Sequence, residues 1–140
     1  MCRGALHYAF RLYTQLSRDR LVGCRCSCDT FERPELGNIK GGLRLGYVDA
    51  AATFRNRKVA LSLVNRHISE PAVVEVRVNG DKGSKLVRPY VMEADRFDAT
   101  PDFGRPDEIR LVRLPAFETD PPFEVTVPPH SVAFYVIGPP

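Results

Sequence analysis

Three of the four cysteines in the chain occupy alternate positions of one short segment, at Cys24, Cys26 and Cys28. Zinc sites usually space their cysteines as C-x2-C, so that a tight turn wraps the ion. Alternate side chains on an extended strand lie roughly 6–7 Å apart, which is too far for a closed tetrahedron and suits a regular disulfide poorly. Cys2 and His67 lie far away in the sequence. The pattern therefore favours small, buried residues on one face of a strand, and we predict no metal site.

The three histidines, His7, His67 and His130, fall in different kinds of segment. His7 lies in an amphipathic stretch, His67 follows an apolar alternation, and His130 lies in the turn "VPPHSV". A Cys–His or Ser–His nucleophilic pair would require two of these regions to converge. The pattern favours structural or surface roles, and we predict no catalytic residue among them.

Acidic side chains gather between residues 95 and 108, where they offer a carboxylate pair or a calcium site as alternatives to solvated charge. Their spacing matches no calcium-loop pattern, so solvated loop charge is favoured. The stretch "GGLRLG" lacks the lysine and the following helix of a phosphate-binding loop. We therefore predict no cofactor. The acidic residues are Asp95, Asp98, Asp102, Asp107 and Glu108.

The composition is that of one ordinary globular domain of 140 residues, with 44% hydrophobic and 26% charged residues. The net charge of +3 arises from interleaved signs, and the densest basic stretch, "RNRK" at residues 55–58, lies between two apolar alternations. This argues against nucleic-acid binding. No apolar run approaches the ~20 residues of a membrane span, and no secretory signal is evident. We expect a cytoplasmic protein without membrane or nucleic-acid partners.

The elements that would position these residues begin with one amphipathic helix. Within "GALHYAFRLYTQLSRD", apolar residues recur at steps of three and four, as in Leu6, Ala9, Phe10, Tyr13 and Leu16. After Arg20 the period changes to two, and Val22, the three cysteines and Thr30 share one face. Residues 32–46 carry one proline and four glycines, and we predict a long connection there.

Strand patterns then follow closely. "YVDAAATF" and "KVALSLVN" predict a hairpin that turns at "RNR", with Leu61 and Leu63 on the same face. "AVVEVRVN" directs Val74, Val76 and Val78 inward, and Pro89 in "KLVRPYVME" indicates an edge strand or a bulge.

A loop of about fifteen residues follows, and "IRLVRL", "FEVTVPP" and "SVAFYVIG" complete the chain. The predicted fold class is all-β. It is an antiparallel β-sandwich of about eight strands, of jelly-roll or Greek-key type, preceded by one amphipathic α-helix.

Four stretches together resemble the C-terminal domain of the family 51 α-L-arabinofuranosidases, which are glycoside hydrolases. They are a "Y-[LV]-D-[VA]-[SA]-A" strand, a hairpin ending in "VNR", a "D-x-x-A-T-N-x-F-x-x-P-D" loop and a closing "L-P-P-H-S-V". Residues 47–51, 64–66, 98–107 and 127–132 stand in those places. Pro101 departs from the pattern, because the family usually has asparagine there.

The resemblance implies that residues 1–18 are a remnant of the last helix of a catalytic barrel and that residues 19–140 form the C-terminal sandwich. The family hydrolyses terminal α-L-arabinofuranosyl groups with two glutamates that belong to the barrel. None of the glutamates here occupies a matching motif, so no catalytic residue is carried over and the isolated chain is expected to be inactive. The barrel is the expected partner, homo-oligomerisation stays open, and Leu6, Phe10 and Tyr13 are predicted to form a partly exposed apolar face.

A stand-alone module that binds carbohydrate or a partner subunit is the alternative. Sugar-binding sandwiches stack sugar rings on exposed planar aromatic side chains, of which tryptophan is the commonest, and this chain has no tryptophan. Core packing is the favoured role for the aromatic residues that remain. These are Phe97, Phe103, Tyr47, Tyr90 and Tyr135.

Overall fold

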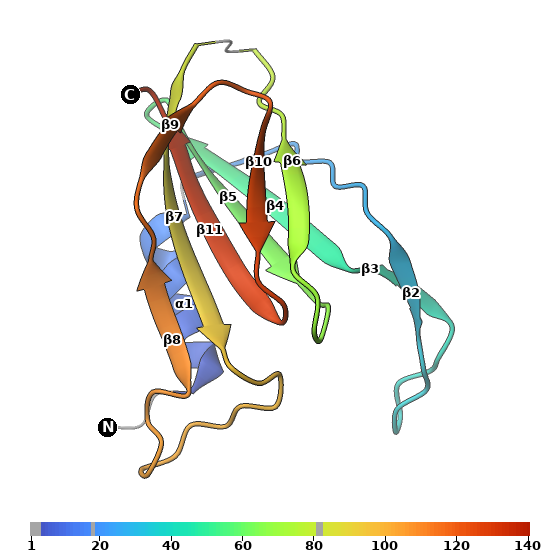
Figure 1. Ribbon diagram of the computed structural model, residues 1–140. Coiled ribbons are helices and arrows are strands. Elements are labelled where there is room, and N and C mark those ends of the chain that lie inside the picture. The colour runs from blue at the N-terminus through green and yellow to red at the C-terminus, as the bar shows by residue number, and fades with distance from the viewer. Residues whose placement is uncertain (1–3, 18, 81–82) are drawn as a thin grey trace.

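The computed structural model describes residues 4–17, 19–80 and 83–140, and within them it has one helix and eleven strands (Figure 1). All strand pairs are antiparallel. The predicted all-β sandwich with a leading helix is confirmed, with more strands than the eight expected. Cys2 lies outside the described residues.

A large sheet forms the main layer, in the order β1-β4-β5-β11-β7-β8, and β9 pairs with β7 beside β8. Its central strand β11 pairs from Ser131 to Ile137 with β5 on one side and from Val132 to Gly138 with β7 on the other. The strands are β1 (Arg20–Val22), β4 (Val48–Arg55), β5 (Lys58–Asn65), β7 (Lys85–Ala94), β8 (Ile109–Arg113), β9 (Phe117–Thr119) and β11 (Ser131–Gly138).

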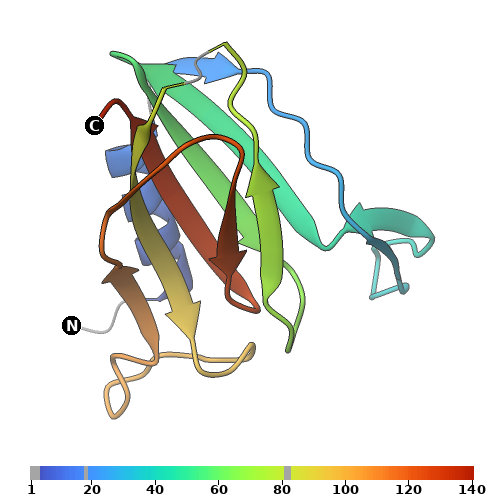
Figure 2. The ribbon, with the colours of Figure 1, turned by 45° about the horizontal axis from the view of Figure 1, so that its top comes forward.

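The second layer consists of β6 (Ala72–Val76) and β10 (Phe123–Val127), which pair with each other in front of the large sheet (Figure 2). Alternate side chains of both layers meet to form the core, as the period of two predicts. The predicted inward residues Leu61, Leu63 and Val76 belong to this core, and Val74 and Val78 are partly buried against it.

Helix α1 (Ala5–Leu16) packs on the opposite face of the large sheet, against β11 and β8 (Figure 1). Leu12 is only 1% exposed, and the ring of Tyr13 meets that of buried Phe134 edge-on at 4.8 Å between centroids. Leu6 and Phe10, on the outer side of the helix, are 74% and 67% exposed, and Tyr13, at the edge of the contact with the sheet, is 40% exposed. The predicted partly exposed face is confirmed.

The hairpin between β4 and β5 turns at Asn56 and Arg57, which have φ angles of 49° and 61°. Positive φ at both central residues is typical of the two-residue turns whose twist matches that of paired strands. The basic stretch at residues 55–58 is thus a solvent-exposed hairpin tip, as predicted.

The predicted long connection over residues 32–46 is wrong. β2 (Thr30–Arg33) and β3 (Leu43–Gly46) form a small hairpin of their own. Phe31 lies opposite Leu45 and packs on Tyr47, with 4.8 Å between the ring centroids. The glycines that suggested a loop serve the turn between these strands, where Gly42 has a φ of +80°.

Pro89 does not lie on an edge strand, because β7 has neighbours on both sides. On one side, however, β8 pairs from Tyr90 onward and β9 only as far as Val87. The Pro89 carbonyl accepts a hydrogen bond from the N–H of Leu114 at this break. Proline has no backbone N–H to donate. At Pro89 the side that lacks this donor faces the gap between β8 and β9, so the sheet loses no hydrogen bond there.

Candidate functional site

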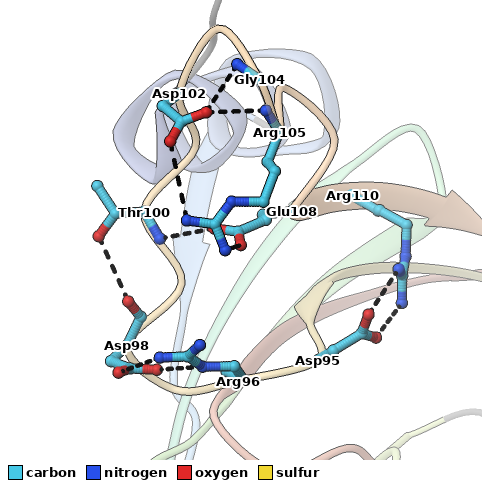
Figure 3. A network of polar contacts seen from close by, with 9 residues as sticks. All are labelled: Asp95, Arg96, Asp98, Thr100, Asp102, Gly104, Arg105, Glu108 and Arg110. Carbon is cyan, nitrogen blue, oxygen red and sulfur yellow. Dashed lines mark hydrogen bonds and ion pairs between the residues drawn. The ribbon is translucent and has the colours of Figure 1, made fainter.

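In the acidic loop between β7 and β8, aspartate carboxylates accept hydrogen bonds from arginines of the same region (Figure 3). Arg96 donates to both carboxylate oxygens of Asp98 at 2.9 and 2.6 Å, and Arg110 donates to Asp95 at 2.8 Å. These hydrogen bonds lower the pKa values of Asp95 and Asp98. A general acid for glycoside hydrolysis needs a raised pKa, so these two carboxyls are unsuited to that role.

The distal part of the loop is held by further internal contacts (Figure 3). Asp102 accepts the N–H groups of Gly104 and Arg105, both at 2.8 Å, and Arg105 pairs with Glu108 at 2.5 Å. Glu108 also accepts the N–H of Thr100 at 3.1 Å. The aspartates of the predicted loop charge are thus exposed, as expected, whereas Glu108 is half-buried, and these contacts shape the loop.

His130 connects three segments near the same end of the sandwich. Its ring nitrogens Nδ1 and Nε2 lie 2.7 and 2.9 Å from the carbonyl oxygens of Ile68 and Ala94, and its N–H donates to the carbonyl of His67 at 2.7 Å. Because these partners are backbone oxygens, His130 has a structural role, which confirms that interpretation for this residue.

The other two histidines also make structural contacts. The ring of His67 stacks on Tyr47 at 4.3 Å between centroids, and its Nε2 lies 3.5 Å from Glu70. His7 contacts the ring of Tyr8 on the exposed helix, at 5.5 Å. The structure brings the segments of His67 and His130 together, but neither ring is described in contact with a cysteine thiol or a serine hydroxyl.

Sequence reasoning missed Asn65, which is only 2% exposed. Its side-chain N–H groups contact the carbonyl oxygens of Glu70, Val127 and Pro128 at 2.9–3.1 Å, and its Oδ1 accepts the N–H of His67 at 2.9 Å. Asn65 therefore ties β5 to the turn between β10 and β11. The sequence feature that could have revealed Asn65 is its position: a polar amide side chain at the end of an apolar strand, within the "VNR" motif.

The prediction that Cys24, Cys26 and Cys28 are buried in a strand is wrong. The segment between β1 and β2 is extended but pairs with no strand among the described residues, and all three cysteines are exposed residues whose thiols are only partly covered. Alternation predicted a common direction for the side chains but not a partner for the backbone. The thiols of Cys26 and Cys28 lie 3.7 and 3.3 Å from the Val48 carbonyl oxygen. Partial burial raises the pKa values of the Cys24 and Cys26 thiols.

These cysteines form one wall of a groove that has a volume of about 410 Å³. The other wall is β6 and the residues that follow it, up to Arg77, and the floor is the inner face of β4 and β5. Among the residues that the structure describes, no three His, Cys, Asp or Glu side chains are placed to hold a metal ion.

Exposed apolar side chains occur on the outer side of α1 and on the acidic loop. Phe97 and Phe103 are 65% and 91% exposed, so core packing is wrong for these two residues. It is right for Tyr135, which is buried, whereas Tyr47 and Tyr90 are half-buried. No helix in the described part of the chain has the length and hydrophobicity to cross a bilayer.

Solved structures of glycoside hydrolases share this fold, although no protein-family model and no curated protein matches the sequence. An α-L-arabinofuranosidase from Thermotoga maritima superposes with a TM-score of 0.84 over 99% of this chain, at 21% identity. Family 51 arabinofuranosidases from Thermotoga petrophila and Bifidobacterium longum give TM-scores of 0.78 and 0.71, at 21% and 17% identity. This chain covers only 30%, 29% and 26% of the lengths of those three proteins. It therefore has the fold of a part, less than a third, of an α-L-arabinofuranosidase.

Proposed function

We propose that this chain is the accessory β-sandwich of an α-L-arabinofuranosidase and acts by docking on a catalytic (β/α)8 barrel. The observation that carries the proposal is the match of nearly the whole chain to under a third of such enzymes. The residue motifs at 47–51, 64–66, 98–107 and 127–132 support the same assignment independently. Residues 1–18 would then derive from the last barrel helix and residues 19–140 from the C-terminal sandwich.

The outer side of α1 is the surface best suited to meet the barrel. Leu6 and Phe10 are more than half exposed on a helix whose other side is packed on the sheet through Leu12. Apolar side chains gathered on one helix face are typical of a protein interface. The sandwich would cover the barrel there and keep it folded, while the reaction takes place elsewhere.

The chemistry itself would be supplied by the barrel. Retaining glycoside hydrolysis uses two carboxyl groups about 5 Å apart, one as nucleophile and one as acid and base. In this chain, Asp95, Asp98 and Glu108 are engaged by arginines on an exposed loop. We therefore expect the isolated chain to be inactive towards arabinofuranosides.

The test is to express the chain with the arabinofuranosidase barrel encoded in the same genome and to measure complex formation and activity on an aryl α-L-arabinofuranoside. We expect a stable complex that releases arabinose, and no release by this chain alone. Phe10→Ser should weaken the complex about tenfold or more, because it removes a large exposed ring from the interface. Gln15→Ser, on the same helix and also exposed, is the matched control. Arabinose release by the 140-residue chain alone, or the absence of a complex between the chain and the barrel, would contradict the proposal.

A stand-alone sugar-binding module is the second candidate, and the exposure of Phe97 and Phe103 is the observation that favours it. Such rings can stack on the faces of sugars. Retention of the chain on immobilised arabinan, lost in Phe103→Ala but kept in Phe117→Ala, would support this reading. Free passage through the matrix would eliminate it.

A further inference from the structure

The second layer of the sandwich is incomplete. The large sheet places seven strands in one layer, whereas β6 and β10 are the only described strands that cover it on the core side. β6 pairs with β10 along one edge, and its other edge has no partner strand in the described part of the chain. In an antiparallel strand, alternate residues direct their N–H and C=O groups to opposite sides. Every second residue of β6 therefore presents both groups to the groove.

The opposite wall of the groove has the same property. Residues 23–28 run in an extended path from β1 towards β2, beside β6 and over β4 (Figure 2). Among the described residues, no backbone hydrogen bond reaches this stretch; the bond nearest to it runs from the N–H of Tyr47 to the carbonyl of Asp29. Two unpaired backbones thus line one groove.

The floor of the groove is apolar and belongs to the core face of β4 and β5. It is formed by Val48, Ala50, Leu61 and Leu63, of which Leu63 is only 1% exposed. A ligand that fits must offer apolar groups to this floor and backbone-like donors and acceptors to both walls. An extended polypeptide meets both needs, because its side chains alternate between the faces and its backbone groups point to the two sides.

We propose that the groove takes up one β-strand of the polypeptide that carries the catalytic barrel, and that this strand completes the second layer. The inference rests on the proposed function, since it names how that partner is held. The walls formed by residues 24–28 and 73–77 admit about five residues of strand, roughly 17 Å. In the bound strand, small apolar side chains would face the floor of the groove, and the side chains that point outward would be neutral or acidic. Arg25 on the rim forms no ion pair with a described residue, whereas Arg77 is paired with Glu75.

The partner is the source because every described strand of this chain already has its place in a sheet. Proteins of the same fold are more than three times as long, so polypeptide beyond this chain is expected in the functional unit. A strand held between two backbones would also be fixed in register, unlike an apolar contact at the helix alone.

The first experiment is hydrogen exchange on the complete chain with and without the co-expressed barrel protein. Binding should slow amide exchange about tenfold or more within residues 24–28 and 73–77. Overlapping 15-residue peptides tiled over the barrel sequence should then identify one segment that produces the same protection. A barrel that binds the chain while these amides exchange at their free rate would overturn strand uptake and leave the docking function intact.

The second experiment blocks the groove chemically. Reaction of the three thiols with N-ethylmaleimide places bulky groups on one wall and should reduce peptide binding tenfold or more. The triple variant Cys24→Ser, Cys26→Ser and Cys28→Ser, treated in the same way, should keep its binding. Equal binding by the modified and unmodified chains would overturn the proposal.

The source of the strand is tested by the same measurements. Protection of the groove amides that rises with the concentration of this chain alone would assign the groove to a second copy and overturn the barrel as the source. The helix variant Phe10→Ser separates the two proposals, because it should weaken docking of the barrel without changing the affinity of the free peptide.

Discussion

The centre of the large sheet and the groove beside β6 show two opposite ways of treating a polypeptide backbone. β11 is hydrogen-bonded to β5 and β7, covered by α1 on one face and by core side chains on the other. The groove has two extended segments that face each other without pairing, above an apolar floor. The same sequence thus completes one region within itself and leaves the other incomplete.

This difference separates the region that the chain completes with its own strands from the region to which we assign the proposed partner. Buried backbone groups without partners are costly, so a protein tolerates them where water or another chain satisfies them. The ties at Asn65 and His130 belong to the completed region, although both lie in the motifs that carry the family resemblance. Those motifs therefore report the fold, whereas the two walls of the candidate groove and the exposed side of α1 lie outside them.

The largest effect is expected on the two sides of α1. Leu12→Ala should destabilise the chain by about 2–5 kcal/mol, because it opens a cavity between the helix and the sheet. Leu6→Ala, on the exposed side, should change the free energy of unfolding by no more than about 0.5 kcal/mol. Chemical denaturation of both variants checks the contrast. Equal losses would mean that the outer side of the helix is not an unpartnered surface.

A high-pH experiment tests the packing between β11 and β10. The Tyr135 hydroxyl donates to the Thr126 carbonyl at 3.2 Å, and burial raises its pKa from 10.0 to about 12. A folded-state pKa above the unfolded one gives stability that is complete below pH 10 and is lost as the pH rises towards 12. The loss should reach roughly 3 kcal/mol, and it should be absent in Tyr135→Phe. A wild-type chain whose stability matches the Phe variant at each pH would contradict burial of this hydroxyl.

The buried amide of Asn65 provides the next test. Asn65→Ala should cost about 2 kcal/mol, since the carbonyls of Val127 and Pro128 lose a donor in a buried site. Asn79→Ala, at an exposed turn, is the matched control and should stay within about 0.5 kcal/mol. Thermal unfolding of the two variants would show whether stability is lost because the hydrogen bonds of Asn65 are removed or because an asparagine is replaced at any position.

The smallest effect is expected on the acidic loop. Arg110 and Arg96 hold the pKa values of Asp95 and Asp98 below their ordinary range, so the stability that these pairs add is present above about pH 4 and is lost as the pH falls through the lowered pKa values. Replacing both aspartates by asparagine should flatten the acid limb of the stability curve slightly. Asp107→Asn, at a residue that forms no ion pair with a described residue, should leave the curve unchanged.

Side-chain periodicity predicted the parts of the fold where burial decides the structure. The hairpin of β4 and β5, the inward face of β6 and the helix follow directly from spacings of two and of three to four residues. It failed at residues 23–29, because alternation is the same for a paired and an unpaired extended segment. It also failed at residues 32–46, where frequent glycines concealed a short hairpin.

The candidate groove was less accessible to sequence reasoning than the fold. Its cysteines were noticed, but the apolar floor comes from strands that are distant in the chain, and a free strand edge has no residue signature. The exposed side of α1 was predicted only from the family resemblance, because that resemblance implies a catalytic barrel that the helix would contact. Residues that serve an absent partner look, in isolation, like residues of a core.

The position of β11 has a consequence for how the chain is made. This strand follows all the others in the sequence, yet it is the one that joins β5 and β7 into a single sheet. During synthesis, the two parts of the large sheet would lack their central strand until β11 is made. Their apolar edges would meanwhile be open to association with other chains. A nascent chain released before Ser131 would therefore be a substrate for chaperones or proteases rather than a smaller stable domain.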